Sequence, residues 1–304
     1  MAEPAETSPR CGFVALIGAP NVGKSTLVNA LVGGKVSIVS PKAQTTRALI
    51  RGIAVDGSAQ LIFVDTPGIF APRRRLDRAM VGTAWGGARE ADIVAFVVDC
   101  RKGVRDEDEE VLRGLANVRA PKLLVLNKID LVAKPALLSL AQTLNERASL
   151  AATFMISALA DDGVGDFKSW LAEHVPVGPW LYPEDQISDA PLRQLAAEIT
   201  REKLYLRLHQ ELPYQSTVET EVWKELKDGS VRIEQTIYVE RESQRKIVLG
   251  HGGQTVKAIG AAARADIAAA IGQPAHLFLF VKVREGWADD PERYREMGLE
   301  FPKE

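Results

Sequence analysis

The apolar positions of this chain form short unbroken runs in its first half and alternating or helical patterns in its second half. Six runs in the first half predict strands, because short apolar runs bounded by turn residues are typical of strands buried on both faces. They cover residues 13–17, 49–55, 60–64, 93–98, 122–126 and 153–156. Helical patterns alternate with these runs, so we expect an α/β fold with a mostly parallel sheet.

The second half predicts a smaller α+β domain. An amphipathic helix pattern spans 192–212, and residues 218–223 and 231–240 alternate like a hairpin with Asp228-Gly229-Ser230 at its turn. Apolar residues on one face predict a helix after Gly253, and residues 276–283 predict a last strand. Residues 247–249 fit a strand by pattern alone.

Domain boundaries follow from changes in composition. Residues 1–10 are polar and contain proline, which predicts a flexible tail and not a signal peptide. Residues 175–191 are rich in proline and irregular, so they predict a linker between domains at 11–174 and 192–304.

Composition narrows the function classes. The 304 residues carry a formal net charge of -2, so any nucleic-acid surface must be local. Two separated cysteines and four scattered histidines suggest neither a zinc site nor a disulfide framework, which fits a reducing cytoplasm. The sequence contains no window of about 20 apolar residues, so it predicts no membrane span.

The run Gly18-Ala19-Pro20-Asn21-Val22-Gly23-Lys24-Ser25 fits the P-loop pattern, between a predicted strand and a helix that begins near Thr26. Backbone N–H groups and the helix N-terminus favour a bound phosphate there. We expect all of these residues, including Thr26, to bind a nucleotide. Lys24 should reach the β- and γ-phosphates, and the Ser25 hydroxyl should bind Mg²⁺.

Two further segments predict contacts to the metal and the γ-phosphate. Asp65-Thr66-Pro67-Gly68 ends a buried strand, where Asp65 can hold Mg²⁺ and the Gly68 N–H can meet the γ-phosphate. The loop 40–47 contains Thr45 and Thr46, and either one could bind Mg²⁺ while the γ-phosphate is present. That loop would then be an order–disorder switch; the alternative is a plain surface loop.

The segment Asn127-Lys128-Ile129-Asp130 follows another buried strand and predicts which nucleotide base is bound. The Asp130 carboxylate can accept both N1–H and N2–H₂ of guanine, a donor pair that adenine lacks. Asn127 would hold the loop, and the Lys128 stem would cover the base. A backbone N–H of Ser157-Ala158 can meet guanine O6. The expected ligands are therefore GTP and GDP with Mg²⁺.

In this order, with Gln44-Thr45-Thr46-Arg47 and Ser157-Ala158-Leu159, the motifs resemble the Era-like family of TrmE–Era-type GTPases. The segment 69–90 resembles a mobile second switch region; the alternative for its Arg73-Arg74-Arg75 is a solvated face. Asn21 matches an asparagine that resembles a potassium ligand in related GTPases, so K⁺ is a second expected cation. Ile69 stands where Ras-like enzymes carry a water-orienting Gln, so we expect slow unassisted hydrolysis.

Gly250-His251-Gly252-Gly253, with Arg245 and Lys246 ahead of it, resembles the glycine loop of a type II KH domain. The resemblance implies a short helix before the loop and RNA contacts from Arg245, Lys246, Gly250, His251, Gly252, Gly253, Lys257 and Arg264. Residues 192–284 hold 14 Lys and Arg against 11 Asp and Glu, so affinity should come from this patch and from base contacts.

The resemblance covers nearly the whole chain after residue 10. It implies a monomeric cytoplasmic GTPase that binds 16S rRNA near its 3′ end and assists maturation of the 30S ribosomal subunit as a GTP-regulated RNA switch. It also implies peripheral contact with the inner face of the cell membrane. The residues alone predict a GTP hydrolase joined to an RNA clamp. The alternatives are a signalling or cell-cycle switch at the membrane, whose second domain contacts protein, and an RNA scaffold with a structural nucleotide.

Overall fold

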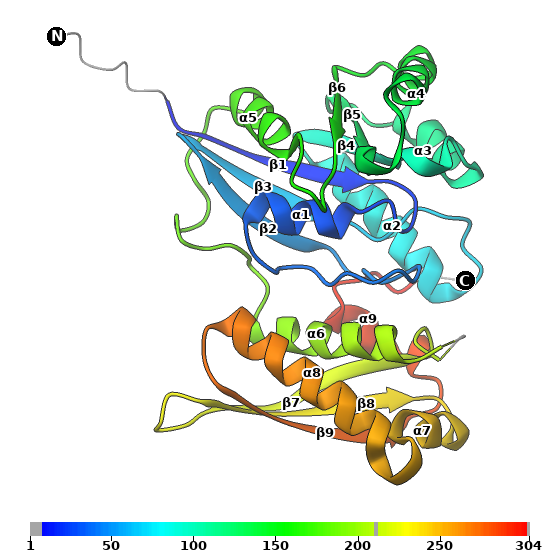
Figure 1. Ribbon diagram of the computed structural model, residues 1–304, viewed down its shortest axis with the longest axis vertical. Coiled ribbons are helices and arrows are strands. Elements are labelled where there is room, and N and C mark those ends of the chain that lie inside the picture. The colour runs from blue at the N-terminus through cyan, green and yellow to red at the C-terminus, as the bar shows by residue number, and fades with distance from the viewer. Residues whose placement is uncertain (1–7, 210–211, 303–304) are drawn as a thin grey trace, which may run out of the picture. The chain divides into compact units, whose positions relative to one another are not determined.

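The computed structural model describes residues 8–209 and 212–302, which form two compact units (Figure 1). The first unit contains the described residues up to Ser37 and the segment Thr46–Asp189. The second contains Ile38–Thr45 together with the residues from Ala190 onward. The eight residues 38–45 precede the second unit by more than 100 positions in the chain, and the sequence patterns did not predict that they belong to it.

A six-stranded sheet forms the centre of the first unit. Its strand order is β2-β3-β1-β4-β5-β6, and only the β2–β3 pair is antiparallel. The strands are β1 (Arg10–Ile17), β2 (Ile50–Asp56), β3 (Ala59–Asp65), β4 (Ile93–Asp99), β5 (Lys122–Asn127) and β6 (Ala152–Ile156). The predicted mostly parallel sheet is therefore confirmed. Residue Arg10, placed by the sequence in the tail, begins β1, and residues 1–7 lie outside the described residues.

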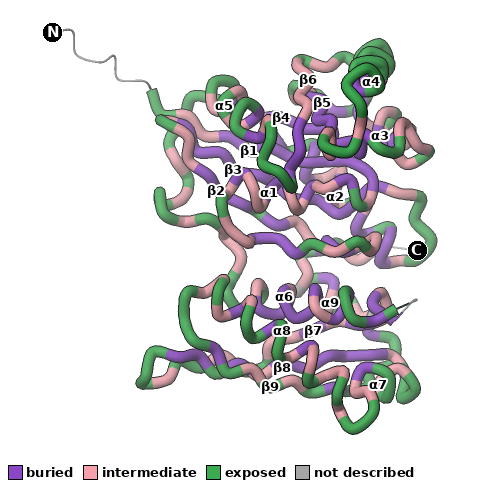
Figure 2. Tube along the Cα trace, in the orientation of Figure 1, coloured by how far each residue is buried: buried purple, intermediate pink, exposed green. Residues whose placement is uncertain are grey.

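Helices cover both faces of this sheet, which explains the unbroken apolar runs (Figure 2). Phe167 and Leu27 belong to the apolar cluster on one face, and Val111 and Leu144 belong to the cluster on the other. The helices are α1 (Lys24–Val32), α2 (Arg75–Glu90), α3 (Asp106–Leu115), α4 (Lys134–Arg147) and α5 (Val164–His174), with short 3-10 turns at Cys100–Lys102 and Ile129–Leu131.

The segment expected to be a second switch region is mostly the helix α2. Its glycines Gly82 and Gly86 face open space, since a Cβ added at either would have no atom within 4 Å. Buried Leu76, Met80 and Ala84 anchor one face of the helix. This apolar face stabilises the helix although it contains three glycines.

The second unit is a three-stranded sheet with helices against it. Strand β7 (Ser216–Glu225) pairs antiparallel with β8 (Val231–Val239), and β8 pairs parallel with β9 (Ala275–Val283). The helices are α6 (Leu192–Arg207), α7 (Glu242–Leu249), α8 (Gln254–Ile271) and α9 (Pro291–Glu296), with 3-10 turns at His251–Gly253 and Trp287–Asp289. This is the predicted α+β arrangement. The helix predicted to reach Leu212 ends at Arg207, and residues 210 and 211 lie outside the described residues.

Residues 247–249 are helical, so the strand that their pattern also fitted is wrong and the short helix is confirmed. Gln244 accepts hydrogen bonds from the amides of Glu240 and Arg241 at 2.8 and 3.1 Å, which caps the start of α7. Val248 is fully buried in the apolar cluster of this unit. Local capping and one buried position therefore outweigh the β propensity of Ile247 and Val248.

The proline-rich segment packs along the first unit through Gln60, a fully buried residue of β3. Its side chain accepts from the amides of Leu181 and Tyr182 at 2.9 and 3.0 Å and donates to the Tyr182 carbonyl at 2.8 Å. Trp180 Nε1 donates to the Ser58 carbonyl at 3.0 Å. Both aromatic residues of the segment are thus fixed at the β2–β3 end of the sheet.

Candidate nucleotide site and candidate RNA clamp

The P-loop is a tight turn that only glycine can form at two positions. A Cβ at Gly18 would lie 2.3 Å from the Val97 carbonyl oxygen, and one at Gly23 would lie 2.3 Å from Asn127 Nδ2. Gly23 also has φ 100°, which side chains rarely adopt. The backbone N–H groups of the loop therefore stand at the N-terminus of α1 without side chains in the way, which favours an anion there.

Lys24 is buried and lies across this loop. Its Nζ donates to the carbonyls of Gly18 and Ala19 at 3.1 and 3.2 Å. Burial lowers the pKa of Lys24 to about 8, against the opposing effect of the Asp65 charge. A phosphate at the loop would supply the negative charge that this ammonium lacks in its buried position.

Asp65 lies at the centre of a cluster of hydroxyl groups. Its Oδ2 accepts from Ser25 Oγ and Ser37 Oγ, both at 2.6 Å, and Thr46 Oγ1 lies 3.0 Å from Ser25 Oγ. Burial raises the pKa of Asp65 above its ordinary value, although the hydrogen bonds from Ser25 and Ser37 and the Lys24 charge lower it. The other oxygen, Oδ1, is buried without a hydrogen-bond partner among the described residues.

That arrangement fits a magnesium ion. Mg²⁺ prefers a carboxylate, hydroxyl groups, phosphate oxygens and water, and an unsatisfied buried carboxylate oxygen calls for a cation or water. Ser25, Thr46 and Asp65 are the residues that would hold the ion. Ser37 was not singled out by the sequence, since a serine between the P-loop and the next strand carries no recognisable motif.

The structure distinguishes the two threonines between which the sequence could not choose. Thr46 faces Ser25 and Asp65, whereas Thr45 Oγ1 bonds to Ser40 Oγ at 2.6 Å and to the Lys42 carbonyl at 2.8 Å. Thr45 also accepts from Arg201 Nη2 through its carbonyl oxygen at 2.6 Å. Thr46 therefore belongs to the hydroxyl cluster around Asp65, and Thr45 belongs to the segment 38–45 of the second unit.

The Asp65-Thr66-Pro67-Gly68 turn packs directly on the P-loop. Thr66 Oγ1 donates to the Leu16 carbonyl at 2.6 Å, and the Ile69 amide donates to the Gly18 carbonyl at 3.0 Å. A Cβ on Gly68 would lie 2.9 Å from the Pro20 backbone. The Ile69 side chain is fully buried, so it cannot reach a water molecule at the γ-phosphate.

Asn127 ties three segments together behind the P-loop. Its Nδ2 donates to the Val22 carbonyl at 2.8 Å, and its Oδ1 accepts from the amides of Lys128 and Ala158 at 2.8 and 3.0 Å. A guanine O6 at the Ala158 amide would have to share that donor with Asn127. The Ser157 amide is already bonded to the Asp162 carbonyl at 2.9 Å.

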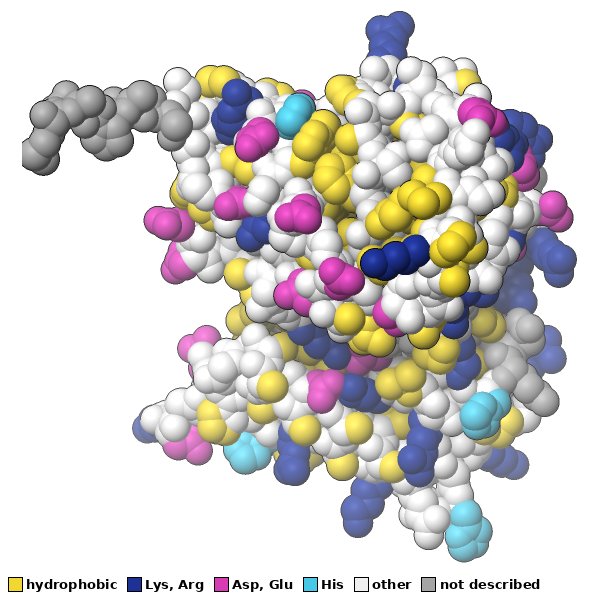
Figure 3. Space-filling view, turned by 45° about the horizontal axis from the view of Figure 1, so that its top comes forward, with side chains coloured by type: hydrophobic (Ala, Val, Ile, Leu, Met, Phe, Trp, Pro, Cys, Tyr) yellow, Lys and Arg dark blue, Asp and Glu magenta, His cyan; other side chains and the backbone are white. Residues whose placement is uncertain are grey.

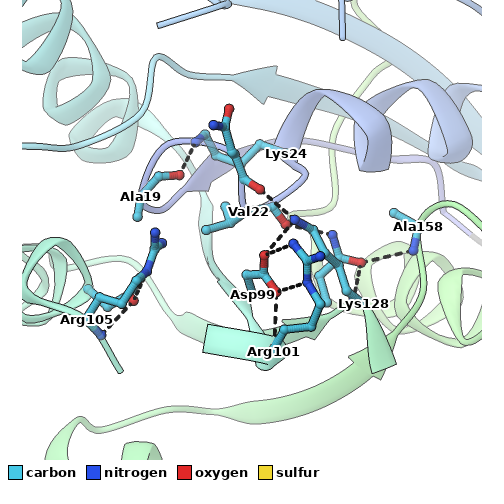
Figure 4. A network of polar contacts seen from close by, with 11 residues as sticks. Ala19, Val22, Lys24, Asp99, Arg101, Arg105, Lys128 and Ala158 are labelled. Carbon is cyan, nitrogen blue, oxygen red and sulfur yellow. Dashed lines mark hydrogen bonds and ion pairs between the residues drawn. The ribbon is translucent and has the colours of Figure 1, made fainter. Parts of the chain in front are cut away.

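The Lys128 ammonium bridges the P-loop and the end of β4. Its Nζ donates to the Asn21 carbonyl and to Asp99 Oδ2, both at 2.7 Å, and Arg101 Nη2 bonds to the same Asp99 oxygen at 2.9 Å (Figure 4). Burial by itself would raise the pKa of Asp99, but the hydrogen bonds from Arg101 and Lys128 outweigh it and bring the pKa to about 2.

Asp99 was missed by the sequence analysis, although it also follows a buried apolar strand. Asp130 and Asn21 are exposed, at positions open to a base and to solvent.

Figure 4 also shows Arg105 on the other side of the P-loop, directed toward Ala19. Its Nε bonds to Asp108 Oδ2 at 3.3 Å, and its Nη2 is buried without a partner among the described residues.

The glycine loop of the second unit presents bare backbone. Gly250, Gly252 and Gly253 have φ of 73°, 56° and 77°. A Cβ at Gly250 would lie 2.1 Å from Thr255 Oγ1, whereas at Gly252 and Gly253 it would meet nothing within 4 Å. Another chain can therefore approach the backbone closely at those two positions.

The side chains predicted to contact RNA differ in whether they are free to do so. Lys246, His251, Lys257 and Arg264 are exposed. Arg245 is already engaged, because its Nε donates to the Val281 carbonyl at 3.1 Å and its Nη1 to Glu242 Oε1 at 2.8 Å. Figure 3 shows Lys and Arg side chains separated by neutral ones on this unit, in agreement with its modest charge excess.

A cavity of about 440 Å³ lies beside the loop and was not predicted. It is lined by Arg207, Leu208, His209, Leu212, Gln215, Gln244, Ile247 and Thr255. Ile247 exposes 58% of its surface, an unusual fraction for isoleucine, and it stands on the helix that leads into the glycine loop.

Comparison with known proteins finds a GTPase family and a KH domain in this chain. Residues 13–128 match the family described as 50S ribosome-binding GTPase, and residues 211–288 match the KH domain. The GTPase Era of Afipia carboxidovorans is 70% identical, over 97% of this chain and 96% of that protein. The GTPase Era of Brucella suis is 68% identical, over 97% and 95% of the two chains.

Two solved structures share the fold of the whole chain, each with a TM-score of 0.90, 38% identity and coverage of 95% of this chain and 99% of the other. One is an Aquifex aeolicus Era variant bound to GDP and AlF4⁻. The other is Era in complex with MgGDPNP and nucleotides 1506–1542 of 16S ribosomal RNA.

The fold and the two sites define a P-loop GTPase that carries a C-terminal KH domain. With relatives of this identity over nearly the full length, the chain belongs to the GTPase Era family. It is therefore an enzyme that hydrolyses GTP to GDP and phosphate.

Proposed function

We propose that this GTPase binds 16S rRNA near its 3′ end and assists maturation of the 30S ribosomal subunit. The observation that carries this is the glycine loop, whose open backbone at Gly252 and Gly253 stands among exposed Lys246, His251 and Lys257. The related Era structure holds nucleotides 1506–1542 of 16S rRNA at 38% identity to this chain. A KH loop of this kind clamps about four nucleotides of backbone.

The nucleotide site supports GTP and GDP with Mg²⁺. Bound Mg²⁺ would neutralise charge on the β- and γ-phosphates, with Ser25, Thr46 and Asp65 as its protein ligands. Lys24 would turn from the Gly18 and Ala19 carbonyls to the phosphates. The N–H of Gly68 would donate to the γ-phosphate. Asp130 would select guanine.

The segment 38–45 is the structural basis for a GTP-regulated switch. Within the second unit its backbone bonds to α6, because the Val39 amide donates to Glu202 Oε1 at 2.9 Å and Arg201 donates to the Thr45 carbonyl. Lys42 donates to the carbonyls of Tyr205 and Leu208. Thr46, the next residue, is the proposed Mg²⁺ ligand, so loss of the γ-phosphate would release the chain directly beside these bonds.

Hydrolysis without an activator should be slow, because the buried Ile69 cannot orient water. Asn21 is proposed to help bind K⁺, which would stabilise negative charge in the transition state. Faster turnover in potassium than in sodium buffer would support this role. Equal turnover in both would remove it, and fast basal turnover in sodium would contradict the assignment of Ile69.

The domain boundaries, the oligomeric state and the location in the cell are also proposals. We propose a GTPase domain at 11–174, a linker at 175–191 and an RNA-binding domain at 192–304, in a monomer that acts in the cytoplasm. No helix within residues 8–209 and 212–302 has the length and apolar character needed to cross a bilayer. Any contact with the inner face of the cell membrane should be peripheral, so high salt should release it completely.

The RNA clamp is tested by Gly252→Asp. The added carboxylate would stand where a phosphate approaches, and φ 56° is a conformation that Asp tolerates better than most residues. We expect the affinity for nucleotides 1506–1542 of 16S rRNA to fall by about 1–3 kcal/mol, with unchanged GTP affinity. The measurement is a fluorescence anisotropy titration of the labelled RNA.

Gly229→Asp is the matched control. Gly229 lies in the same unit, at the β7–β8 turn, with φ 80° and open space around its Cβ position. It should melt like Gly252→Asp and bind RNA like the wild type. If Gly252→Asp is folded and retains wild-type RNA affinity, the clamp is wrong.

A further inference from the structure

The sheet of the second unit has α6 and α8 against one face, whereas on the opposite face Arg293 of α9 pairs with Glu219 of β7 and two phenylalanines of β9 are exposed. Successive side chains of a strand point to opposite faces. On β9, Leu277, Leu279 and Val281 belong to the apolar clusters beneath the helices. His276, Phe278, Phe280 and Lys282 alternate with them and therefore form part of the opposite face, which we call the outer face.

Two aromatic side chains, two residues apart on β9, lie exposed on the outer face. Phe278 and Phe280 expose 45% and 49% of their surface, which is high for phenylalanine. Two residues along a strand span about 7 Å, so one extended ligand can contact both side chains. Their neighbours on β8 are Glu234 and Thr236. An exposed patch of this kind usually marks a binding site.

Basic side chains accompany these rings. The guanidinium carbon of Arg232 lies 4.9 Å from the centre of the Phe278 ring, and His276 and Lys282 are exposed on either side of the two phenylalanines. Arg284 lies 3.9 Å from the centre of the Tyr238 ring on the neighbouring strand. Aromatic rings beside guanidinium and ammonium groups are the combination that binds single-stranded nucleic acid.

The carboxylates of the outer face do not oppose an anion strongly, because each has a partner. Glu234 pairs with Arg232 at 2.6 Å, and Glu219 pairs with Arg293 at 2.9 Å. Glu221 accepts from the Tyr238 hydroxyl at 2.9 Å. Lys282 has no ion pair among residues 8–209 and 212–302, so the charge left for a ligand is positive.

We propose that the outer face is a second RNA-binding surface, on which bases of a single-stranded segment stack against Phe278 and Phe280. Other RNA-binding sheets use exposed aromatic residues in this way. The inference rests on the proposed function, since it assigns a further segment of the same RNA. A protein partner would also meet an apolar patch, but the flanking Lys282, whose charge no carboxylate of residues 8–209 and 212–302 balances, favours a polyanion.

The length and path of the RNA support this assignment. A glycine loop clamps about four nucleotides, whereas the related Era holds nucleotides 1506–1542. Strand β9 is an edge of the sheet, and Arg245 on α7 bonds to its Val281 carbonyl at 3.1 Å. Arg245 therefore connects the helix before the glycine loop to the edge of β9, next in sequence to Phe280 of the outer face.

The test replaces the rings but keeps apolar bulk. Full-length protein with MgGDPNP is titrated against labelled RNA of nucleotides 1506–1542. Phe278→Leu/Phe280→Leu should weaken binding at least about 10-fold, because leucine cannot stack on a base. Phe278→Tyr/Phe280→Tyr should stay within about 3-fold of the wild type, since its rings still stack. Leu206→Ala, at a 49% exposed position on α6, is the control and should bind normally.

The outcomes separate this inference from the function on which it rests. If the wild type does not bind the RNA, the proposed function is wrong and this surface loses its ligand. If the wild type binds and the leucine variant binds equally well, only the outer face is overturned. If the leucine variant binds the RNA normally but no longer associates with 30S subunits, the face docks protein, and the RNA assignment is also overturned.

Discussion

The side-chain amide of Asn127 donates to the carbonyl oxygen of Val22 over 2.8 Å and so fixes the base-recognition loop to the P-loop. The same nitrogen leaves no room for a side chain at Gly23, where a Cβ would lie 2.3 Å away. The phosphate-binding and base-binding segments, 105 residues apart, therefore form one rigid site. Asp130 extends from this site and is exposed for a base.

Guanine specificity should depend on Asp130. Asp130→Asn replaces one of two accepting oxygens with a donor, which no longer matches N1–H and N2–H₂ of guanine. We expect GTP affinity to fall roughly 10- to 100-fold and xanthosine triphosphate to bind better than it does to the wild type. Nucleotide titrations measure both values. Unchanged GTP affinity would show that the base lies elsewhere.

Thr46 and Thr45 provide a matched pair for the metal site. Thr46→Ala removes a proposed Mg²⁺ ligand and should lower GTP turnover roughly 10-fold or more. Thr45→Ala removes only the hydrogen bonds to Ser40 and Lys42, so it should change turnover less than about 3-fold. Turnover is measured at saturating Mg²⁺ and GTP. The assignment fails if Thr45→Ala is the more damaging substitution.

Much of the first unit could be predicted because its signals are local. Buried strands show as apolar runs, and Gly18, Lys24, Asp65 and Asn127 belong to fixed spacings. Ser37, Asp99 and Arg105 were missed, since only the folded chain brings them to the site. The choice between Thr45 and Thr46 also needed the fold, because neighbouring threonines look alike in sequence.

The second unit shows the same limit. Alternation predicted its strands, but residues 247–249 fitted a strand by pattern alone, whereas the cap at Gln244 and the burial of Val248 make them helical. Residues 38–45 join this unit through hydrogen bonds to Arg201 and Glu202, which lie more than 150 positions further along the chain. No local pattern carries that information.

The buried Lys24 should make stability depend on pH. Its pKa in the fold is about 8 against an ordinary 10.5, so the unfolded chain binds more protons between these values. The contribution of this group to stability therefore rises as pH rises through this window. At pH 7, nucleotide-free Lys24→Met should be roughly 1–3 kcal/mol more stable than the wild type, and the difference should shrink toward pH 10.

Denaturant unfolding at several pH values measures this difference. Lys257→Met, at an exposed lysine, is the control and should show no such trend. If Lys24→Met is less stable than the wild type at pH 7, the hydrogen bonds from the ammonium to the carbonyls of Gly18 and Ala19 outweigh the cost of burying its charge.

Two glycines in helices should respond oppositely to alanine. Gly82 in α2 has open space around its Cβ position, so Gly82→Ala should stabilise the protein by roughly 0.5–1 kcal/mol through helix propensity. A Cβ at Gly114 in α3 would lie 2.2 Å from the Trp85 ring, so Gly114→Ala should destabilise it by roughly 1–3 kcal/mol. Thermal melts compare the two. Destabilisation by Gly82→Ala would mean that α2 does not persist as a helix in solution.

We propose that the nucleotide controls RNA binding through the segment 38–45, which is tested by comparing RNA affinity in two nucleotide states. Labelled RNA of nucleotides 1506–1542 is titrated with the full-length protein in MgGDPNP and, separately, in MgGDP. We predict at least about 10-fold tighter binding with MgGDPNP, equivalent to about 1.4 kcal/mol, and loss of this difference in Thr46→Ala. Equal RNA affinity of the wild type in both nucleotide states would contradict the account.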